Sequence, residues 1–266
     1  MKNINYYPKT KMSPWRKISL ASWKPTGDSA CYCFEEIIAD PLLDYCKTNS
    51  INLHSFIIKA FSNAIHKEPT INSTIRWGKL YRRKPISVFF HTILNSRKDD
   101  LSGIVIEEGQ DKKMMDLDEE YSVKVKDSKE GLNDFTESKK ITNATPSFFT
   151  KPILNLYSFI SYTLNLNLAL FKSKKNSFGS VMITSIGSLG ISRAFCPIAP
   201  YTKVPMVASV GKIEEKPVVI NQEIKIKKVI SLGFTFDHRI MDRLHFSEFF
   251  KVLNSYFINP KSIDNV

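Results

Sequence analysis

Ionisable side chains gather in one short segment near the C-terminal end, Asp237-His238-Arg239-Ile240-Met241-Asp242. Apolar residues alternate with small or polar ones from Ile230 to Phe236, which predicts a strand with one buried face before this segment. Apolar residues at helical spacing from Phe246 to Phe257 predict an amphipathic helix after it. Because the end of a strand is held rigidly, a side chain at such a junction can be aimed at a reacting atom.

The histidine at this junction indicates proton transfer. The ordinary pKa of an imidazole is ~6.5, so His238 can take and return a proton near neutral pH. A metal site is the competing interpretation, because Asp237, Asp242 and His245 also carry ligand atoms. His238 and His245 are seven residues apart and fall on different predicted elements, so we favour acid–base chemistry and predict no metal.

The D-H-R-x-x-D run between a strand and a helix resembles the active-site segment of the dihydrolipoamide acyltransferases, the core components of 2-oxo acid dehydrogenase complexes. Chloramphenicol acetyltransferase, a relative of that family, has a similar H-x-x-x-D-G. The family pattern ends in glycine, where this chain has Arg243. A condensation domain, whose pattern is H-H-x-x-x-D-G, fits less well because Asp237 occupies the first histidine position.

Other segments are similar to the same family and extend the resemblance from about Ser13 to Pro260. Near the start they are Ser13–Ile18, with its Arg16-Lys17 pair, and Phe56–Asn72, which follows an F-x-x-K-A … P-x-x-N pattern. Further along they are Lys112–Leu117 and Phe178–Gly190, the second of which resembles F-T-I-S-S-x-G-x-x-G. The resemblance implies an α/β fold, a two-layer sandwich with a mixed β-sheet like that of chloramphenicol acetyltransferase. It also implies that residues 1–266 form a single acyltransferase catalytic domain.

The resemblance also implies roles for individual residues. His238 would be the catalytic base, and Thr184 would supply the hydroxyl that stabilises the oxyanion, where the family has a serine. Asp242 would form a structural ion pair with Arg16. Ser185 and Arg239 would be accessory residues. In the family the histidine and the hydroxyl face each other across a homotrimer interface, and coenzyme A enters by a tunnel.

We found no lipoyl domain and no peripheral-subunit-binding segment in the sequence. We therefore expect a free-standing coenzyme A-dependent acyltransferase that moves an acyl group between a thioester and an unknown thiol or hydroxyl acceptor. The alternative is a catalytically inactive trimeric scaffold or a membrane-associated interaction protein of the same fold. Arg243 and Thr184, which depart from the family pattern, keep that alternative open.

Several further elements follow from local patterns. We predict strands at residues 30–37, 85–94, 101–107 and 206–211, a hairpin near Val218 and Ile226, and helices starting at Asp40 and at Leu53, the second ending by Pro69. Asp40 before Pro41 is typical of a helix N-cap. We interpret His54 and His66 as core-edge and surface residues of the second helix, and His91 as a structural residue.

Two segments between the predicted strands differ from the rest. Residues 111–140 are rich in charge and predict a solvated helix and loop. Residues 146–175 form a hydrophobic insertion, in which Pro152–Phe171 has no charged residue and lysines lie on both sides. This insertion could dock on its own domain, contact a membrane surface or a partner, or span a membrane.

Composition limits the remaining possibilities. The formal net charge of +12 favours anionic partners, but no nucleic-acid-binding motif accompanies it, so we predict no nucleic acid partner. The polar stretch from Met1 to Trp15 has no apolar core and does not predict a secretory signal. The four cysteines lack zinc-site spacing and indicate reduced thiols, so we expect a cytoplasmic protein, with peripheral membrane attachment left open.

Overall fold

A computed structural model describes residues 3–8, 29–93, 101–132, 147–167 and 176–265. Arg16 and the Ser13–Ile18 segment therefore lie outside the described residues, as do parts of the charged segment and of the insertion.

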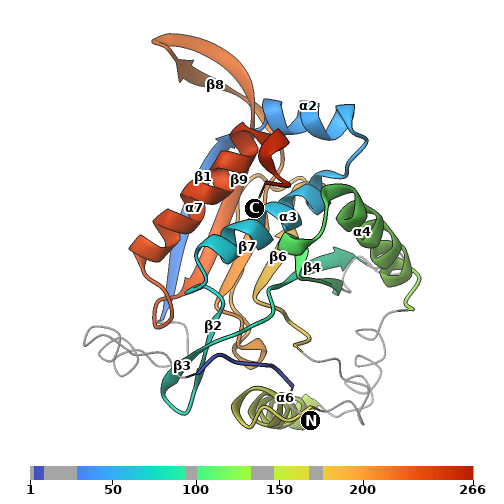
Figure 1. Cartoon of the computed structure of the whole chain (residues 1–266), viewed down its shortest axis with the longest axis vertical. Coiled ribbons are helices and arrows are strands. Elements are labelled where there is room, and N and C mark those ends of the chain that lie inside the picture. The colour runs from blue at the N-terminus through green and yellow to red at the C-terminus, as the bar shows by residue number, and fades with distance from the viewer. Residues whose placement is uncertain (1–2, 9–28, 94–100, 133–146, 168–175, 266) are drawn as a thin grey trace.

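A mixed sheet forms the centre of the structure (Figure 1). Its strands are β1 (Ala30–Ile38), β4 (Ser87–Ile93), β5 (Leu101–Glu107), β6 (Val181–Ser185), β7 (Met206–Val210), β8 (Glu214–Ile220) and β9 (Glu223–Asp237). Their order is β1-β9-β7-β6-β4-β5, with β8 paired to β9. Strand β6 runs parallel to both of its neighbours, and the other pairs are antiparallel. The predicted mixed α/β fold is confirmed.

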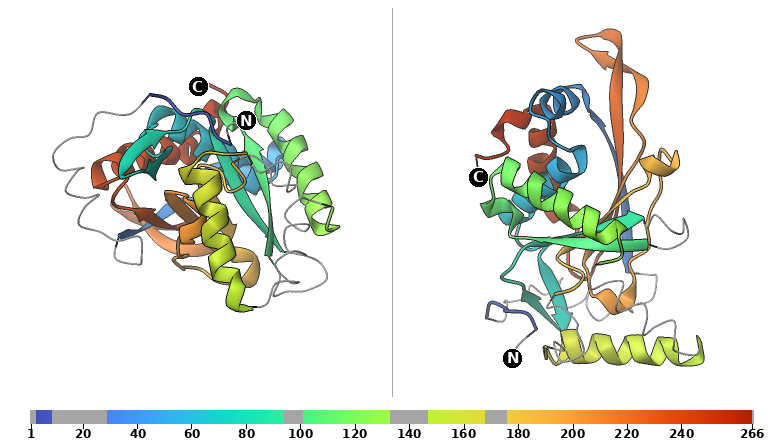
Figure 2. Two further views of the ribbon diagram at one scale, coloured as in Figure 1. Left: turned by 90° about the horizontal axis from the view of Figure 1, so that it is seen from below. Right: turned by 90° about the vertical axis from the view of Figure 1, so that its right-hand side faces the viewer.

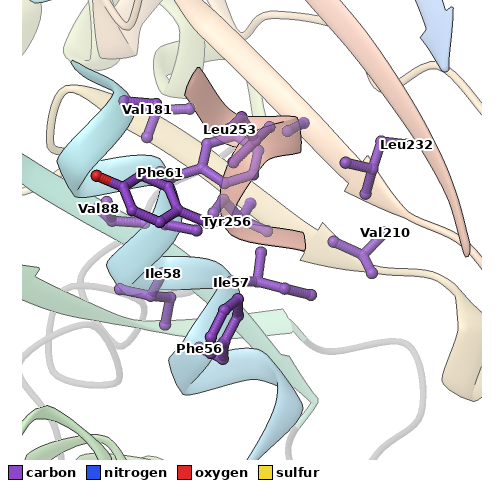
Figure 3. Close-up of a cluster of buried hydrophobic side chains, with 14 of the residues drawn as sticks. Phe56, Ile57, Ile58, Phe61, Val88, Val181, Val210, Leu232, Leu253 and Tyr256 are labelled. Atoms are coloured by element: carbon purple, nitrogen blue, oxygen red, sulfur yellow. The ribbon is translucent and has the colours of Figure 1, made fainter. Parts of the chain in front are cut away.

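Helices form a layer on one face of this sheet (Figure 2). They are α2 (Asp40–Thr48), α3 (Leu53–Lys67), α4 (Met114–Lys129) and α7 (Arg243–Ile258). Helix α3 lies deepest, because every side chain from Ser55 to Ile65 is buried. Figure 3 shows Phe56, Ile57 and Phe61 packed among residues of the sheet and of α7. Burying one such side chain stabilises the fold by about 1.5–3 kcal/mol.

Two residues of the family-like F-x-x-K-A … P-x-x-N stretch have structural roles. The buried Lys59 Nζ donates to the carbonyl oxygens of Gln110, at 3.0 Å, and Lys112, at 2.5 Å. Asn72 Nδ2 donates to the carbonyl oxygens of Pro85, at 2.9 Å, and Arg83, at 3.3 Å. Lys59 thus joins α3 to the segment that follows β5, and Asn72 joins the turn after α3 to the segment that precedes β4.

The predicted N-cap role of Asp40 is wrong. Asp40 is the first residue of α2 rather than its N-cap, and Ala39 occupies the cap position without a side-chain hydrogen bond. The Asp40 carboxylate instead accepts from the backbone N–H of Lys228 at 3.2 Å. The start of α2 is thus fixed by contact with β9, which a local pattern cannot reveal.

The opposite face of the sheet is covered by a smaller apolar cluster, made of Ile4, Phe89, Tyr162, Phe178, Met182, Val204 and Val207. The hydrophobic insertion contributes to it through helix α6 (Ser147–Ser158) and the single π-helical turn η2 (Phe159–Thr163). Asn165 Nδ2 donates to the Ile4 carbonyl at 2.7 Å, and Arg76 donates two bonds to the Thr163 carbonyl. None of the helices in the described ranges is long and apolar enough to cross a membrane.

The remaining elements are short. A separate two-stranded hairpin consists of β2 (Ser73–Arg76) and β3 (Lys79–Arg82), and 3-10 turns lie at η1 (Gly109–Asp111), η4 (Gly187–Leu189), η5 (Pro200–Thr202) and η6 (Pro260–Ser262). The β8–β9 hairpin projects away from the body of the molecule (Figure 1).

Candidate active site

An internal ion pair holds the strand-to-helix junction. Asp237, the last residue of β9, accepts from Arg239 Nε at 2.9 Å and from Arg239 Nη2 at 2.5 Å. The backbone N–H of Arg239 donates to the same carboxylate at 3.0 Å. Both side chains are largely buried, so the pair is well placed to fix the path of the chain around His238.

His238 is anchored through its backbone. Its N–H donates to the carbonyl oxygen of Ser29 at 2.7 Å, next to β1. The carbonyl of Asp237 accepts from the N–H groups of Ile240 and Met241 at 2.9 and 3.1 Å, which closes a tight turn after the histidine. The partly exposed imidazole is therefore attached to a backbone that hydrogen bonds hold in place, as we predicted for a junction residue.

Asp242 begins helix α7. Its Oδ1 accepts from the backbone N–H groups of Leu244 and His245 at 3.0 and 3.3 Å, and His245 Nδ1 lies 2.8 Å from the same oxygen. Burial alone would raise the pKa of Asp242, but attraction to His245 and these hydrogen bonds hold the pKa below its ordinary value. The predicted pair with Arg16 lies outside the described residues.

The two hydroxyl residues at the end of β6 lie on opposite faces of the sheet. Val181 and Ile183 belong to the core under the helices, whereas Met182 belongs to the cluster on the other face. Because side chains alternate along a strand, Ser185 lies on the helical face and Thr184 on the other. Ser185 accordingly contacts helix α3, where His54 Nε2 lies 3.0 Å from its Oγ.

One chain does not bring Thr184 and His238 together. Thr184 is level with Ser209 on β7, which faces Gly233 on β9. His238 lies five residues beyond Gly233, so ~16 Å farther along the sheet, and β9 is two strands (~10 Å) away from β6. The predicted base and oxyanion donor thus lie at opposite ends of the sheet, and a shared site needs two copies of the chain.

The two carboxylates of the competing metal hypothesis each have a partner side chain. The Asp237 carboxylate faces Arg239, and the Asp242 carboxylate faces His245. Within the part of the chain that the structure describes, no group of three or more His, Cys, Asp or Glu side chains is arranged to hold a metal ion.

Sequence reasoning missed one residue, which lies beside the end of β6. We interpreted His54 as a core-edge residue, but its ring joins Ser185 to Tyr121 of α4, whose hydroxyl lies 3.4 Å from His54 Nδ1. Ser185 and His54 are separated by 131 positions. No local pattern could have indicated this contact.

The sequence of the C-terminal third matches a known family. Residues 171–264 match the catalytic domain of the 2-oxoacid dehydrogenase acyltransferases. An 82-residue segment is 34% identical to the dihydrolipoyllysine-residue acetyltransferase component of the pyruvate dehydrogenase complex of Acholeplasma laidlawii, and covers 31% of this chain. Another, of 86 residues, is 31% identical to the lipoamide acyltransferase component of the branched-chain alpha-keto acid dehydrogenase complex of Pseudomonas putida and covers 32% of this chain. These segments span only 15% and 19% of the two relatives' length.

Solved structures show the same fold over nearly the whole chain. The cubic core of the pyruvate dehydrogenase multienzyme complex matches with a TM-score of 0.64 at 16% identity, covering 98% of this chain and 93% of that one. The dihydrolipoamide acetyltransferase of Azotobacter vinelandii matches with the same score and coverage at 15% identity. Chloramphenicol acetyltransferase matches with a TM-score of 0.52 at 9% identity, covering 96% and 100%.

These comparisons correct one expectation and confirm others. The expectation of a free-standing coenzyme A-dependent acyltransferase is wrong, because the matching relatives are lipoamide and dihydrolipoyllysine acyltransferase components of dehydrogenase complexes. The error came from drawing a conclusion about the substrate from the lack of a lipoyl pattern in this sequence, which does not bear on the thioester that the site takes. The predicted enzyme class, an acyltransferase, is confirmed at the level of these relatives. The segment that carries both Thr184 and His238 thus matches the catalytic domain of the 2-oxoacid dehydrogenase acyltransferases, and the chain as a whole has their fold.

Proposed function

We propose that this chain is an acyltransferase catalytic unit that moves an acyl group from S-acyl-dihydrolipoamide to coenzyme A. The observation that carries the proposal is the match over residues 171–264, because that segment contains both Thr184 and His238. The names of the relatives, dihydrolipoyllysine-residue acetyltransferase and lipoamide acyltransferase, support lipoamide as the partner thiol.

The chemistry assigns one role to each group. His238 takes the proton from the thiol of coenzyme A, and the thiolate attacks the thioester carbonyl. The Thr184 hydroxyl donates to the oxyanion of the tetrahedral intermediate. When the intermediate collapses, the carbon–sulfur bond to lipoamide breaks, and the proton on His238 passes to the departing dihydrolipoamide sulfur.

The acyltransferase of A. vinelandii gives further support. Its catalytic mechanism has been examined through a serine, a histidine and an asparagine, and the histidine and asparagine are four residues apart. His238 and Asp242 have the same separation. Asparagine and aspartate cap helices about equally well, so the cap formed by Asp242 is compatible with either residue type.

The active assembly is proposed to be a homotrimer with each site shared by two subunits. The separation of Thr184 and His238 within one chain supports this proposal, since the two side chains of a single chain are too far apart to act on the same substrate. The structural likeness to the cubic core of a dehydrogenase complex is compatible with it, though the likeness itself concerns the fold.

Formation of acyl-coenzyme A from S-acetyl-dihydrolipoamide and coenzyme A by the purified protein tests the activity. We expect His238→Ala to slow turnover by roughly 10²–10⁴-fold while circular dichroism stays unchanged, because the imidazole is needed only for proton transfer. Turnover at the wild-type rate by His238→Ala would refute the role of His238. A folded wild-type protein without transfer activity would favour the inactive scaffold instead.

Mixing two inactive variants tests the shared site. Alone, His238→Ala lacks the base and Thr184→Val lacks the hydroxyl. In mixed trimers, a Thr184 from one variant can meet a His238 from the other, so about a quarter of the sites should regain both groups. Mixing two preparations of the same variant is the control. A mixture that stays as inactive as either variant would show that the site lies within one chain.

Two further properties are proposals. We propose a cytoplasmic location, in keeping with cysteines that are all free thiols, of which Cys46 is buried with a pKa raised to about 11 by burial. We also propose that the hydrophobic insertion gives the protein a peripheral contact with anionic membranes. The support is its exposed apolar side, formed by Ile153, Leu156 and Phe159, next to Lys151.

A further inference from the structure

Three side chains from distant parts of the sequence form a hydrogen-bonded chain at the end of β6. Ser185 Oγ lies 3.0 Å from His54 Nε2, and His54 Nδ1 lies 3.4 Å from the hydroxyl of Tyr121. Ser185 ends a strand, His54 lies in the first turn of α3, and Tyr121 lies in the middle of α4. None of them has a part in the transfer mechanism described above.

The surroundings of His54 keep its ring neutral. The imidazole packs against Phe90, with ring centroids 5.0 Å apart, and burial lowers the pKa of His54 below its ordinary value. The first turn of a helix also disfavours a positive charge, because the exposed N–H groups point there. A neutral imidazole has one nitrogen that can accept a proton. If Nδ1–H donates to the Tyr121 oxygen, that accepting nitrogen is Nε2, which faces Ser185.

Ser185, like His54, is partly exposed, and it lies at the end of its strand. A serine hydroxyl within hydrogen-bond reach of a neutral histidine, itself oriented by a third group, is the arrangement that activates a nucleophile. Ser188, on the turn that follows, is a useful contrast: its hydroxyl is exposed and donates to the Ser185 carbonyl at 3.3 Å, and no histidine bond to it is recorded among the described residues.

We propose that Ser185 is a second acyl-accepting group, with His54 as its base and Tyr121 as the residue that orients His54. The substrate class is an activated acyl compound, a thioester or an aryl ester. That the natural substrate is a thioester rests on the proposed function. The Ser185 oxygen bonds to the acyl carbon as the bond to the leaving group breaks, and His54 passes the serine proton to that group. Water then hydrolyses the ester with His54 again as base, which releases the carboxylic acid and restores Ser185.

The test uses p-nitrophenyl acetate on the full chain, with peptide mass spectrometry to locate the acetyl group. This ester needs neither coenzyme A nor lipoamide. We expect acetylation of Ser185 in the wild type and in Ser188→Ala, and none at this position in Ser185→Ala. His54→Asn, which keeps a polar side chain but no base, should slow labelling at least ~100-fold. Tyr121→Phe should slow it by about tenfold if Tyr121 only orients the ring.

The outcomes separate this inference from the proposed function. His238→Ala should lose acyl transfer to coenzyme A and still be acetylated at Ser185. Labelling of Ser185 in a protein that shows no transfer would leave the inference standing and refute the proposed function. Active transfer with Ser185 unlabelled would refute the inference alone. Equal labelling of Ser185 in His54→Asn would also refute it, and that comparison requires a folded variant by circular dichroism. If His54→Asn does not fold, equal acetyl incorporation by Ser185→Ala and the wild type decides against the inference.

Discussion

At the scale of single residues, neighbouring hydroxyls have different surroundings. Thr184 and Ser185 are adjacent in the sequence, yet the strand turns them to opposite faces of the sheet. Thr184 lies on the face away from the helix layer, where a second copy of the chain could reach it. Its β-branched side chain has fewer rotamers than the serine of the family, so its hydroxyl is directed more narrowly.

Asp242 allows a prediction about stability. The carboxylate satisfies two N–H groups at the start of α7, so Asp242→Ala should reduce the free energy of unfolding by about 1 kcal/mol, or roughly 2–4 °C in the melting temperature. Asp242→Asn is the matched control and should stay within about 0.5 kcal/mol, because asparagine caps as well. Thermal unfolding of the wild type and the two variants tests this prediction. An equal loss of stability in both variants would attribute the effect to the charge of Asp242 rather than to its role as the helix cap.

His91 allows a prediction about pH. Burial lowers the pKa of His91 to about 4, so the folded chain keeps it neutral while the unfolded chain takes a proton below pH ~6.5. The contribution of His91 to the free energy of unfolding is fully present above pH ~6.5 and is lost as the pH falls toward 4. Each pKa unit corresponds to about 1.4 kcal/mol, so the loss approaches about 3 kcal/mol.

Urea unfolding of the wild type and His91→Leu measures this effect. Between pH 7 and pH 5, the free energy of unfolding of the wild type should fall by about 2 kcal/mol more than that of the variant, because only the wild type has this histidine to protonate. Subtracting the change in the variant from the change in the wild type removes the contribution of the other titratable groups, which the two proteins share. The same change in both would show that His91 titrates normally in the folded state.

At the scale of elements, the hydrophobic insertion has two parts with different surroundings. Its C-terminal part is tied to its own chain, since Asn165 and Thr163 bond to Ile4 and Arg76. Helix α6 instead presents an exposed apolar side, and the exposed Trp77 lies beside Phe159 with ring centroids 6.0 Å apart. An aromatic pair at the border of an apolar surface is typical of contact with a membrane interface.

Flotation with anionic liposomes tests this surface. We expect the wild type to float at low salt and Leu156→Ser to float much less, because the variant removes an exposed apolar side chain without touching the docked part. Leu244→Ser, at an exposed position on α7, is the matched control and should float like the wild type. Absence of flotation by the wild type would refute the membrane contact.

At the scale of the whole molecule, the projecting β8–β9 hairpin is the most exposed apolar feature of the sheet. Val219 and Ile224 face each other across the hairpin, and Ile226 lies on the same side two residues further on. Their side chains are 70%, 77% and 74% exposed. Contiguous apolar side chains at such exposure mark an interaction surface, and a neighbouring subunit is the partner that the proposed trimer provides.

Light scattering of a hairpin variant tests this interface. The wild type should be a trimer at micromolar concentration, and Ile224→Lys combined with Ile226→Lys should be largely monomeric, since two charges cannot be buried without partners. The monomer should also lose acyl transfer, because Thr184 and His238 then lack their counterparts. Lys225→Ser, on the other side of the strand, is the control. A monomeric wild type would contradict the shared site altogether.

The sequence by itself determined much of this protein. Alternation in Ile230–Phe236 and the apolar stripe of Phe246–Phe257 predicted β9 and α7, because those patterns follow from the local geometry of strands and helices. The D-H-R-x-x-D run and the Phe178–Gly190 segment indicated a resemblance to the acyltransferase family, and with it a mixed sheet, which no local pattern contains.

Only the tertiary structure decided which side chains meet. It separated Thr184 from His238 by placing them at opposite ends of antiparallel strands, and it joined Ser185 to His54 across 131 positions. It also placed the carboxylate of Asp40, which we predicted to be a helix cap, in contact with β9. Such contacts depend on how helices pack on the sheet and on strand register, and both are set by burial of the whole core rather than by neighbours in the sequence.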